Sequence, residues 1–224
     1  MSSEQVTEPN GDQVTERIVA HRVVPVVSIE DERDAEPIGQ ALADGGLPVI
    51  EVTFRTAAAA ASIARLRAAC PDLLVGAGTV LDAATARTAL AAGAQFLVAP
   101  GFDEPTLEVG RGAGVPVVPG AVTPTELQRL LAHGLNLVKF FPAEASGGRA
   151  MLAALAGPFP TARFMPTGGI TPQNLPEYLA LPTVAACGGT WIVTANTVRQ
   201  RRFDEITDRA RDAVTRASST DPDQ

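Results

Sequence analysis

Residues 49–80 read VIEVTFRTAAAAASIARLRAACPDLLVGAGTV. The stretch opens and closes with short apolar runs, and an alanine-rich segment lies between them. Short runs with β-branched residues are typical of strands, and an alanine-rich segment of this length is typical of a helix. We therefore expect two parallel strands joined by a crossover helix.

The same alternation extends from residue 23 to about residue 198. Strands are expected over residues 23–29, 49–54, 73–80, 95–100, 115–120, 136–142, 163–169 and 184–190. Eight such units in about 175 residues predict an α/β protein with a compact (β/α)₈ TIM barrel. An open, doubly wound parallel sheet is the alternative.

A single domain accounts for the 224 residues. We expect the barrel over residues 13–198, with a leading helix near residues 14–22, and a C-terminal amphipathic helix over residues 199–217. The apolar residues at helical spacing in this last helix are Phe203, Ile206, Ala210, Ala213 and Val214. Residues 1–12 and 218–224 are expected to be disordered.

Composition excludes several classes of function. The net charge of −7 gives no basic surface for nucleic acid or an anionic membrane. Cys70 and Cys187 have no CxxC spacing, which argues against a disulfide scaffold or a zinc site, and no other cluster has metal-ligand spacing.

The uncharged residues 178–198 are interrupted by proline and glycine, and the polar N-terminus lacks a signal sequence, so a cytoplasmic location is expected.

The chain has a single lysine, Lys139, against 17 arginines. This lysine lies in the apolar run LNLVKFFP (135–142), where an unpaired ammonium is costly to bury. Its position indicates a chemical role.

Charged residues in the strands of a parallel barrel must point inward near the carboxyl-terminal rim. Strand alternation places Glu51, Thr53 and Arg55 on the inner face of one strand and Lys139 and Phe141 on that of another. A purely structural ion pair is the alternative, but buried pairs contribute little to stability, so the placement favours function.

A desolvated amine beside a carboxylate suits imine chemistry. Desolvation and a nearby guanidinium, for which Arg55 is the candidate, would favour the nucleophilic amine of Lys139. The imine formed with a substrate ketone is an electron sink for breaking the adjacent carbon–carbon bond, and Glu51 is the candidate proton shuttle. These residues predict an imine-forming aldolase.

Glycine-rich segments end three of the expected strands. PTGGIT (166–171) and CGGTWI (187–192) expose backbone amides that can cradle a phosphate or carboxylate, although such pairs of glycines also occur in ordinary turns. In GAGTV (76–80), the hydroxyl of Thr79 suits a carboxylate, or it caps the following helix.

Seven motifs together resemble one enzyme family. They are EVTFRT (51–56), GAGTVL (76–81), APG (99–101), VKFFPAE (138–144), GPF (157–159), PTGGI (166–170) and GGTW (188–191). In order and spacing, residues 23–193 resemble the bacterial 2-keto-3-deoxy-6-phosphogluconate (KDPG) and 4-hydroxy-2-oxoglutarate (KHG) aldolases.

The resemblance implies a homotrimeric barrel that needs no metal or cofactor. It implies reversible cleavage of KDPG to pyruvate and D-glyceraldehyde 3-phosphate, and of KHG to pyruvate and glyoxylate. The galactonate epimer as substrate, or a phosphosugar isomerase or transferase on the same barrel, are the alternatives.

Position by position, the resemblance implies roles for the residues as follows: Lys139 for the imine, Glu51 for proton transfer, Arg55, Thr79 and Thr167 for the pyruvate carboxylate, Gly168, Gly169, Gly188, Gly189 and Thr190 for the phosphate, and Phe141 as a pocket wall. Thr190 departs from the serine usual in the family, and its methyl group is expected to crowd the phosphate.

Overall fold

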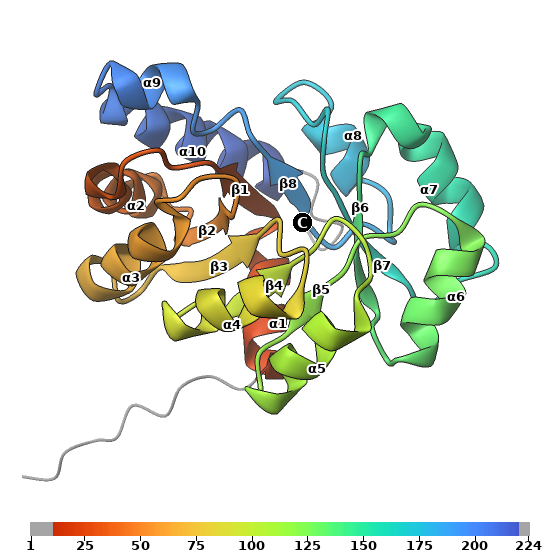
Figure 1. The fold of residues 1–224 in the computed structure, drawn as a ribbon. Coiled ribbons are helices and arrows are strands. Elements are labelled where there is room, and N and C mark those ends of the chain that lie inside the picture. Colours follow the sequence, from red (N-terminus) through yellow and green to blue (C-terminus); the bar gives the residue numbers. More distant parts are fainter. Residues whose placement is uncertain (1–10, 220–224) are drawn as a thin grey trace, which may run out of the picture.

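The computed structural model describes residues 11–219, and within them eight strands lie side by side with helices outside them (Figure 1). The strands are β1 (Val23–Val27), β2 (Val49–Thr53), β3 (Leu74–Gly78), β4 (Phe96–Val98), β5 (Val117–Val118), β6 (Leu137–Phe140), β7 (Arg163–Pro166) and β8 (Cys187–Gly189). Each lies within the range predicted from the sequence.

All strand pairs are parallel. Six strands form one sheet in the order β5-β4-β3-β2-β1-β8, and β6 pairs with β7 in a second sheet. Isolated parallel bridges join Gly120 to Lys139, Phe164 to Val184 and Thr167 to Gly188. The sequential order, with β8 beside β1, contradicts a doubly wound sheet, whose strand order reverses at a switch point.

Side chains cap several of the helices at their N-termini. They are α1 (Gly11–His21), α2 (Ala35–Asp44), α3 (Ala59–Ala69), α4 (Ala83–Ala91), α5 (Glu104–Gly112), α6 (Pro124–Ala132), α7 (Gly148–Ala156), α8 (Leu175–Leu179), α9 (Ala195–Arg199) and α10 (Phe203–Ser218), with 3₁₀ turns η1 (Glu32–Asp34) and η2 (Glu144–Ser146). Asp82, Asp103 and Thr123 accept hydrogen bonds from backbone amides of the first turns of α4, α5 and α6. These caps satisfy amides that have no partner within the helix.

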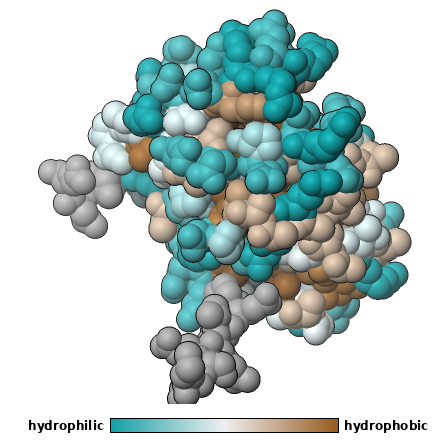
Figure 2. Space-filling view, turned by 90° about the vertical axis from the view of Figure 1, so that its left-hand side faces the viewer, coloured by the Kyte–Doolittle hydropathy of each residue, from teal (hydrophilic) through white to brown (hydrophobic). Residues whose placement is uncertain are grey.

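The core lies between the strands and the helix layer. All five residues of β1, β2 and β3 are buried, and most are aliphatic. The exceptions on β2 are polar: Glu51 and Thr53 are buried too. On the face in Figure 2, hydrophilic residues cover most of the upper part, and hydrophobic residues are more frequent toward the lower right.

Helix α10 is the C-terminal helix that the sequence predicted, with shifted bounds. It begins at Phe203, not at residue 199, which belongs to α9, and it ends at Ser218. It packs against α2, α8 and β1, on the outside of the strands. Ile206, Ala210 and Ala213 are buried, which confirms the predicted apolar face.

At the other end of the chain, α1 includes Gly11 and Asp12, which were expected to be disordered. The rest of the predicted disordered segments lies outside the described residues, apart from Ser218 and Ser219. The uncharged stretch over residues 178–198 is divided among α8, β8 and α9. Within residues 11–219, none of the helices is long and apolar enough to cross a bilayer.

Candidate active site

The lone lysine meets a carboxylate inside the molecule. Lys139 of β6 donates a hydrogen bond from Nζ to Oε1 of Glu51 on β2, at 3.1 Å. The two side chains are 6% and 0% exposed. Strand alternation predicted this common interior, and the result is an amine and a carboxylate in contact away from bulk water.

Glycine at position 78 makes room for this carboxylate. A Cβ atom there would lie 2.1 Å from Oε1 of Glu51, closer than any non-bonded contact allows. The other carboxylate oxygen, Oε2, is buried and has no hydrogen-bond partner among residues 11–219. Because buried polar atoms are nearly always satisfied, this oxygen is free to accept a proton or a hydrogen bond from a ligand.

We expect Gly78→Ala to lower the free energy of unfolding by about 1–3 kcal/mol, the usual penalty for an added methyl group in a packed interior. Gly112→Ala is the matched control, because a Cβ at Gly112 has no heavy atom within 4 Å. Urea unfolding of both variants measures the difference. Equal stabilities for the two variants would contradict the close approach of Glu51 to Gly78.

Thr79 follows β3 with an unusual backbone. Its φ is +57°, a region that β-branched residues rarely adopt and that costs about 1–3 kcal/mol. The alternative prediction, that Thr79 caps the next helix, is wrong because Asp82 caps α4. The Thr79 hydroxyl makes no hydrogen bond within the described part of the chain, so it is available to a ligand.

Arg55 does not join the buried pair. Strand β2 ends at Thr53, and the chain turns at Phe54 and Arg55, so strand alternation no longer fixes the direction of the arginine. Arg55 is exposed, so it is not buried with Glu51. Thr53 does point inward, where its hydroxyl lies 2.7 Å from that of Ser28.

The loop after β7 presents free amides. Gly168 and Gly169 have φ of +95° and +81°, and their carbonyl oxygens accept hydrogen bonds from the backbone N–H of Glu144 and from Asn174 Nδ2. The amides of the two glycines donate to no group within residues 11–219. Successive free amides in such a turn form a concavity for an anion.

The end of β8 adjoins this loop. Thr167 is bridged to Gly188, and a Cβ on Gly188 would lie 2.3 Å from Oγ1 of Thr167. Gly188 and Gly189 are buried within β8, whereas Thr190 is exposed just beyond it. The predicted anion-binding residues of both glycine motifs therefore lie at neighbouring strand ends.

The ring of Phe141 lies between the amine of Lys139 and the loop that follows β7. Its ring centroid lies 5.4 Å from Nζ of Lys139, and its ring atoms lie 3.4 Å from the place of a Cβ on Gly168. The half-buried ring therefore separates the Lys139–Glu51 pair from the free amides, as a pocket wall would.

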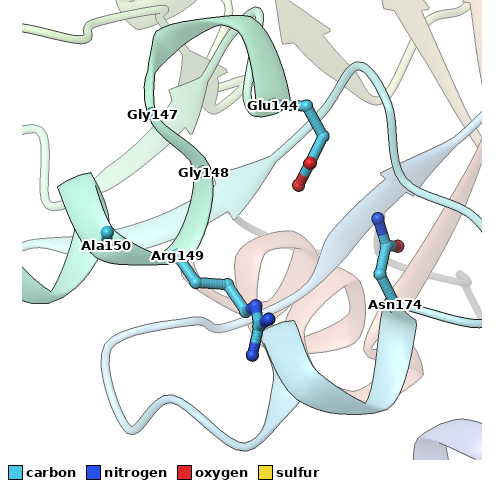
Figure 3. A pocket seen from close by; sticks show the side chains of 6 residues that line it. All are labelled: Glu144, Gly147, Gly148, Arg149, Ala150 and Asn174. Atoms are coloured by element: carbon cyan, nitrogen blue, oxygen red, sulfur yellow. The ribbon is translucent and has the colours of Figure 1, made fainter.

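Sequence reasoning missed the residues behind the loop. A pocket of about 660 Å³ opens there, lined by Glu144, Gly147, Gly148, Arg149, Ala150 and Asn174. Figure 3 shows Glu144 and Asn174 pointing into a common space with Arg149. Glu144 closes the motif VKFFPAE, which was the one signal for it, whereas Asn174 lies outside every motif.

Known proteins with similar sequences come from one enzyme family. The family model for KDPG and KHG aldolase matches residues 14–209. A 2-dehydro-3-deoxy-phosphogluconate aldolase of Treponema pallidum (strain Nichols) is 50% identical over 186 residues, which are 83% of this chain and 89% of the relative. The KHG/KDPG aldolase of Escherichia coli (strain K12) is 44% identical over 192 residues, 86% and 90% of the two chains.

A solved structure is similar over nearly the whole fold. It is a crystal structure of KDPG aldolase from Legionella pneumophila, with pyruvate captured at low pH as a covalent carbinolamine intermediate. The TM-score is 0.86 with 40% sequence identity, and the match covers 92% of this chain and 98% of the other.

Proposed function

Because the chain belongs to the KDPG and KHG aldolase family, and is therefore a carbon–carbon lyase, we propose that it cleaves KDPG reversibly to pyruvate and D-glyceraldehyde 3-phosphate by imine chemistry on Lys139. KHG, cleaved to pyruvate and glyoxylate, is the second substrate. The observation that carries the proposal is the buried contact between Lys139 and Glu51.

The first stage forms the imine. Glu51 takes a proton from the Lys139 ammonium, 3.1 Å away, and the amine attacks C2 of the substrate. As the carbon–nitrogen bond forms, the π electron pair of the ketone moves to its oxygen, and a proton passes from the attacking nitrogen to that oxygen, which gives the carbinolamine. Protonation of that hydroxyl by Glu51 releases water and leaves the protonated imine.

The second stage breaks the carbon–carbon bond. Glu51, a carboxylate again after the loss of water, removes the proton from the C4 hydroxyl. The C3–C4 bond cleaves, and its electron pair moves through C3 and C2 to the imine nitrogen. The aldehyde leaves and an enamine remains. Glu51 then returns a proton to C3, and water hydrolyses the imine to pyruvate and the free amine. The unpartnered Oε2 of Glu51 supports this shuttling role.

The remaining groups hold the two ends of the substrate. Thr79, Thr167 and Arg55 are proposed for the carboxylate, and the half-buried Phe141 is proposed as the wall between the two ends. The phosphate would lie on Gly168, Gly169, Gly188, Gly189 and Thr190. The free amides of Gly168 and Gly169 support this placement, because amides without partners bind an anion with no competing bond to break.

We further propose that the two sheets close into one (β/α)₈ barrel and that three chains assemble. The bridges Gly120–Lys139 and Thr167–Gly188 support closure, because they adjoin both edges of the β6–β7 pair. The assembly of three chains is proposed on the family resemblance. Light scattering should give three times the chain mass of 23.2 kDa, and a monomer would contradict assembly.

Trapping with borohydride tests the mechanism. Incubation with pyruvate and borohydride should reduce the imine and leave a stable adduct on the peptide that contains Lys139. Since Lys139 is the single lysine, the α-amino group is its one competitor for the label. Borohydride without pyruvate is the control. A label found elsewhere, or no label, would rule out imine chemistry at Lys139.

A further inference from the structure

We propose that Tyr178 and Glu144 are positioning residues for the phosphate end of the substrate, and that their hydrogen bond behind the Gly168–Gly169 loop sets the preference for phosphorylated over unphosphorylated substrates. This inference rests on the proposed function, and it assigns a role to two residues that touch neither the amine nor the reacting carbons.

Tyr178 is the chain's single tyrosine. It lies on α8, is fully buried, and donates its hydroxyl proton to Oε1 of Glu144. Burial, together with the hydrogen bond to Glu144, raises the pKa of Tyr178. The phenol therefore stays protonated and remains a donor at any physiological pH.

Glu144 contacts both glycines of the loop. Its backbone N–H donates to the carbonyl oxygen of Gly168 at 3.1 Å. A Cβ on Gly169 would lie 2.4 Å from Cγ of Glu144, so the Glu144 side chain lies against the backbone of Gly169. Tyr178 therefore holds Glu144, and Glu144 in turn contacts the two glycines whose amides are free.

The support extends to the segment that carries the nucleophile. Residues 141–143 connect β6 to Glu144, which begins η2. The preceding Ala143 donates its N–H to the carbonyl oxygen of Thr167 at 2.8 Å. The chain that leaves Lys139 is therefore bonded to the loop that follows β7. Tyr178 connects this unit to the helix layer, since α8 is anchored by buried Leu175 and Leu179.

An ion pair that includes one residue of the pocket lining provides a control at its other member. Arg149 of α7 forms an ion pair with Glu177 of α8 at 2.5 Å, and the two side chains are 50% and 52% exposed. Neither residue contacts Gly168 or Gly169 in the interactions recorded for residues 11–219. Loss of this pair changes the pocket surface but not the loop.

The test compares the two substrates in Tyr178→Phe, which keeps the ring and removes the hydroxyl. We expect KM for KDPG to rise about tenfold, equivalent to about 1.4 kcal/mol of binding. The kcat for KDPG should stay within about twofold, and kcat/KM for KHG, which has no phosphate, should be unchanged. A purely structural defect would lower kcat/KM for KDPG and for KHG by the same factor.

Three further variants keep the test decisive. Glu144→Ala removes the acceptor and should match Tyr178→Phe; because this side chain is exposed, the variant can replace Tyr178→Phe if the latter does not fold. Glu144→Gln retains an acceptor oxygen for the Tyr178 hydroxyl, so its KM for KDPG should lie close to that of the unmodified chain. Glu177→Gln removes the exposed partner of Arg149 and should leave kcat and KM for both substrates unchanged.

The outcomes separate this inference from the proposed function. If the unmodified chain releases no pyruvate and takes no borohydride label, the proposed function fails. If it does both, but Tyr178→Phe and Glu144→Ala change KDPG and KHG equally or leave both unchanged, the positioning role is overturned and the proposed function stands.

Discussion

Lys139→Arg releases pyruvate from KDPG at least about 10⁴-fold more slowly than the unmodified chain, within the range that loss of a covalent nucleophile produces. Arginine keeps a positive charge for Glu51, so the buried pair and the fold persist. The guanidinium, however, does not supply a neutral amine near neutral pH, and no imine forms. A coupled dehydrogenase assay measures the pyruvate.

This variant also separates two classes of enzyme. A phosphosugar isomerase or transferase would use the anion cradle without covalent chemistry and would keep substantial turnover in Lys139→Arg. The matched control is Arg65→Lys at an exposed ion pair with Glu32, which should leave the rate unchanged. Turnover of Lys139→Arg within about tenfold of the unmodified chain would contradict the imine mechanism.

Glu51→Gln is expected to lower kcat about 10²–10⁴-fold, the range for loss of a positioned acid–base group. The amide fits the space left by Gly78, but it neither accepts the ammonium proton nor returns a proton to the enamine. Steady-state kinetics with KDPG measure the loss. Glu177→Gln, which removes an exposed carboxylate, is the control, and a loss below tenfold in Glu51→Gln would exclude the shuttle.

Stability provides an independent readout at the same position. Removing one member of a buried ion pair costs about 3–5 kcal/mol, because the remaining charge loses its partner. Glu51→Gln should therefore unfold at lower urea concentration. Adding Lys139→Met removes the orphaned charge and should restore most of the stability, and equal urea midpoints for the single and double variants would contradict the pairing of the two charges.

The strands were predictable because their signals are local. The runs that became β1 and β2 are apolar and β-branched, and helices and glycines punctuate them. Strand ends were less predictable. The expected strand over 115–120 forms regular pairing at Val117 and Val118, because the two prolines that flank this pair cannot donate to a ladder.

The site was predictable where strand geometry decides it and not where loops do. Alternation placed Glu51 and Lys139 in one interior, since both lie within regular strands. The same rule failed for Arg55, which lies after β2 has ended. The partnership of Tyr178 with Glu144 joins residues 34 positions apart, and no local pattern encodes such a contact.

The position of α10 bears on how the chain folds during synthesis. Strand β1 pairs with β8, and α10 packs on β1 and α2. Because β1 is synthesised first and these partners last, β1 lacks its full set of contacts until synthesis is nearly complete. Until then, one edge of β1 and part of its apolar surface are exposed to other nascent chains. Early termination before Phe203 would thus release a product prone to aggregation, although every residue of the Lys139–Glu51 chemistry had already been made.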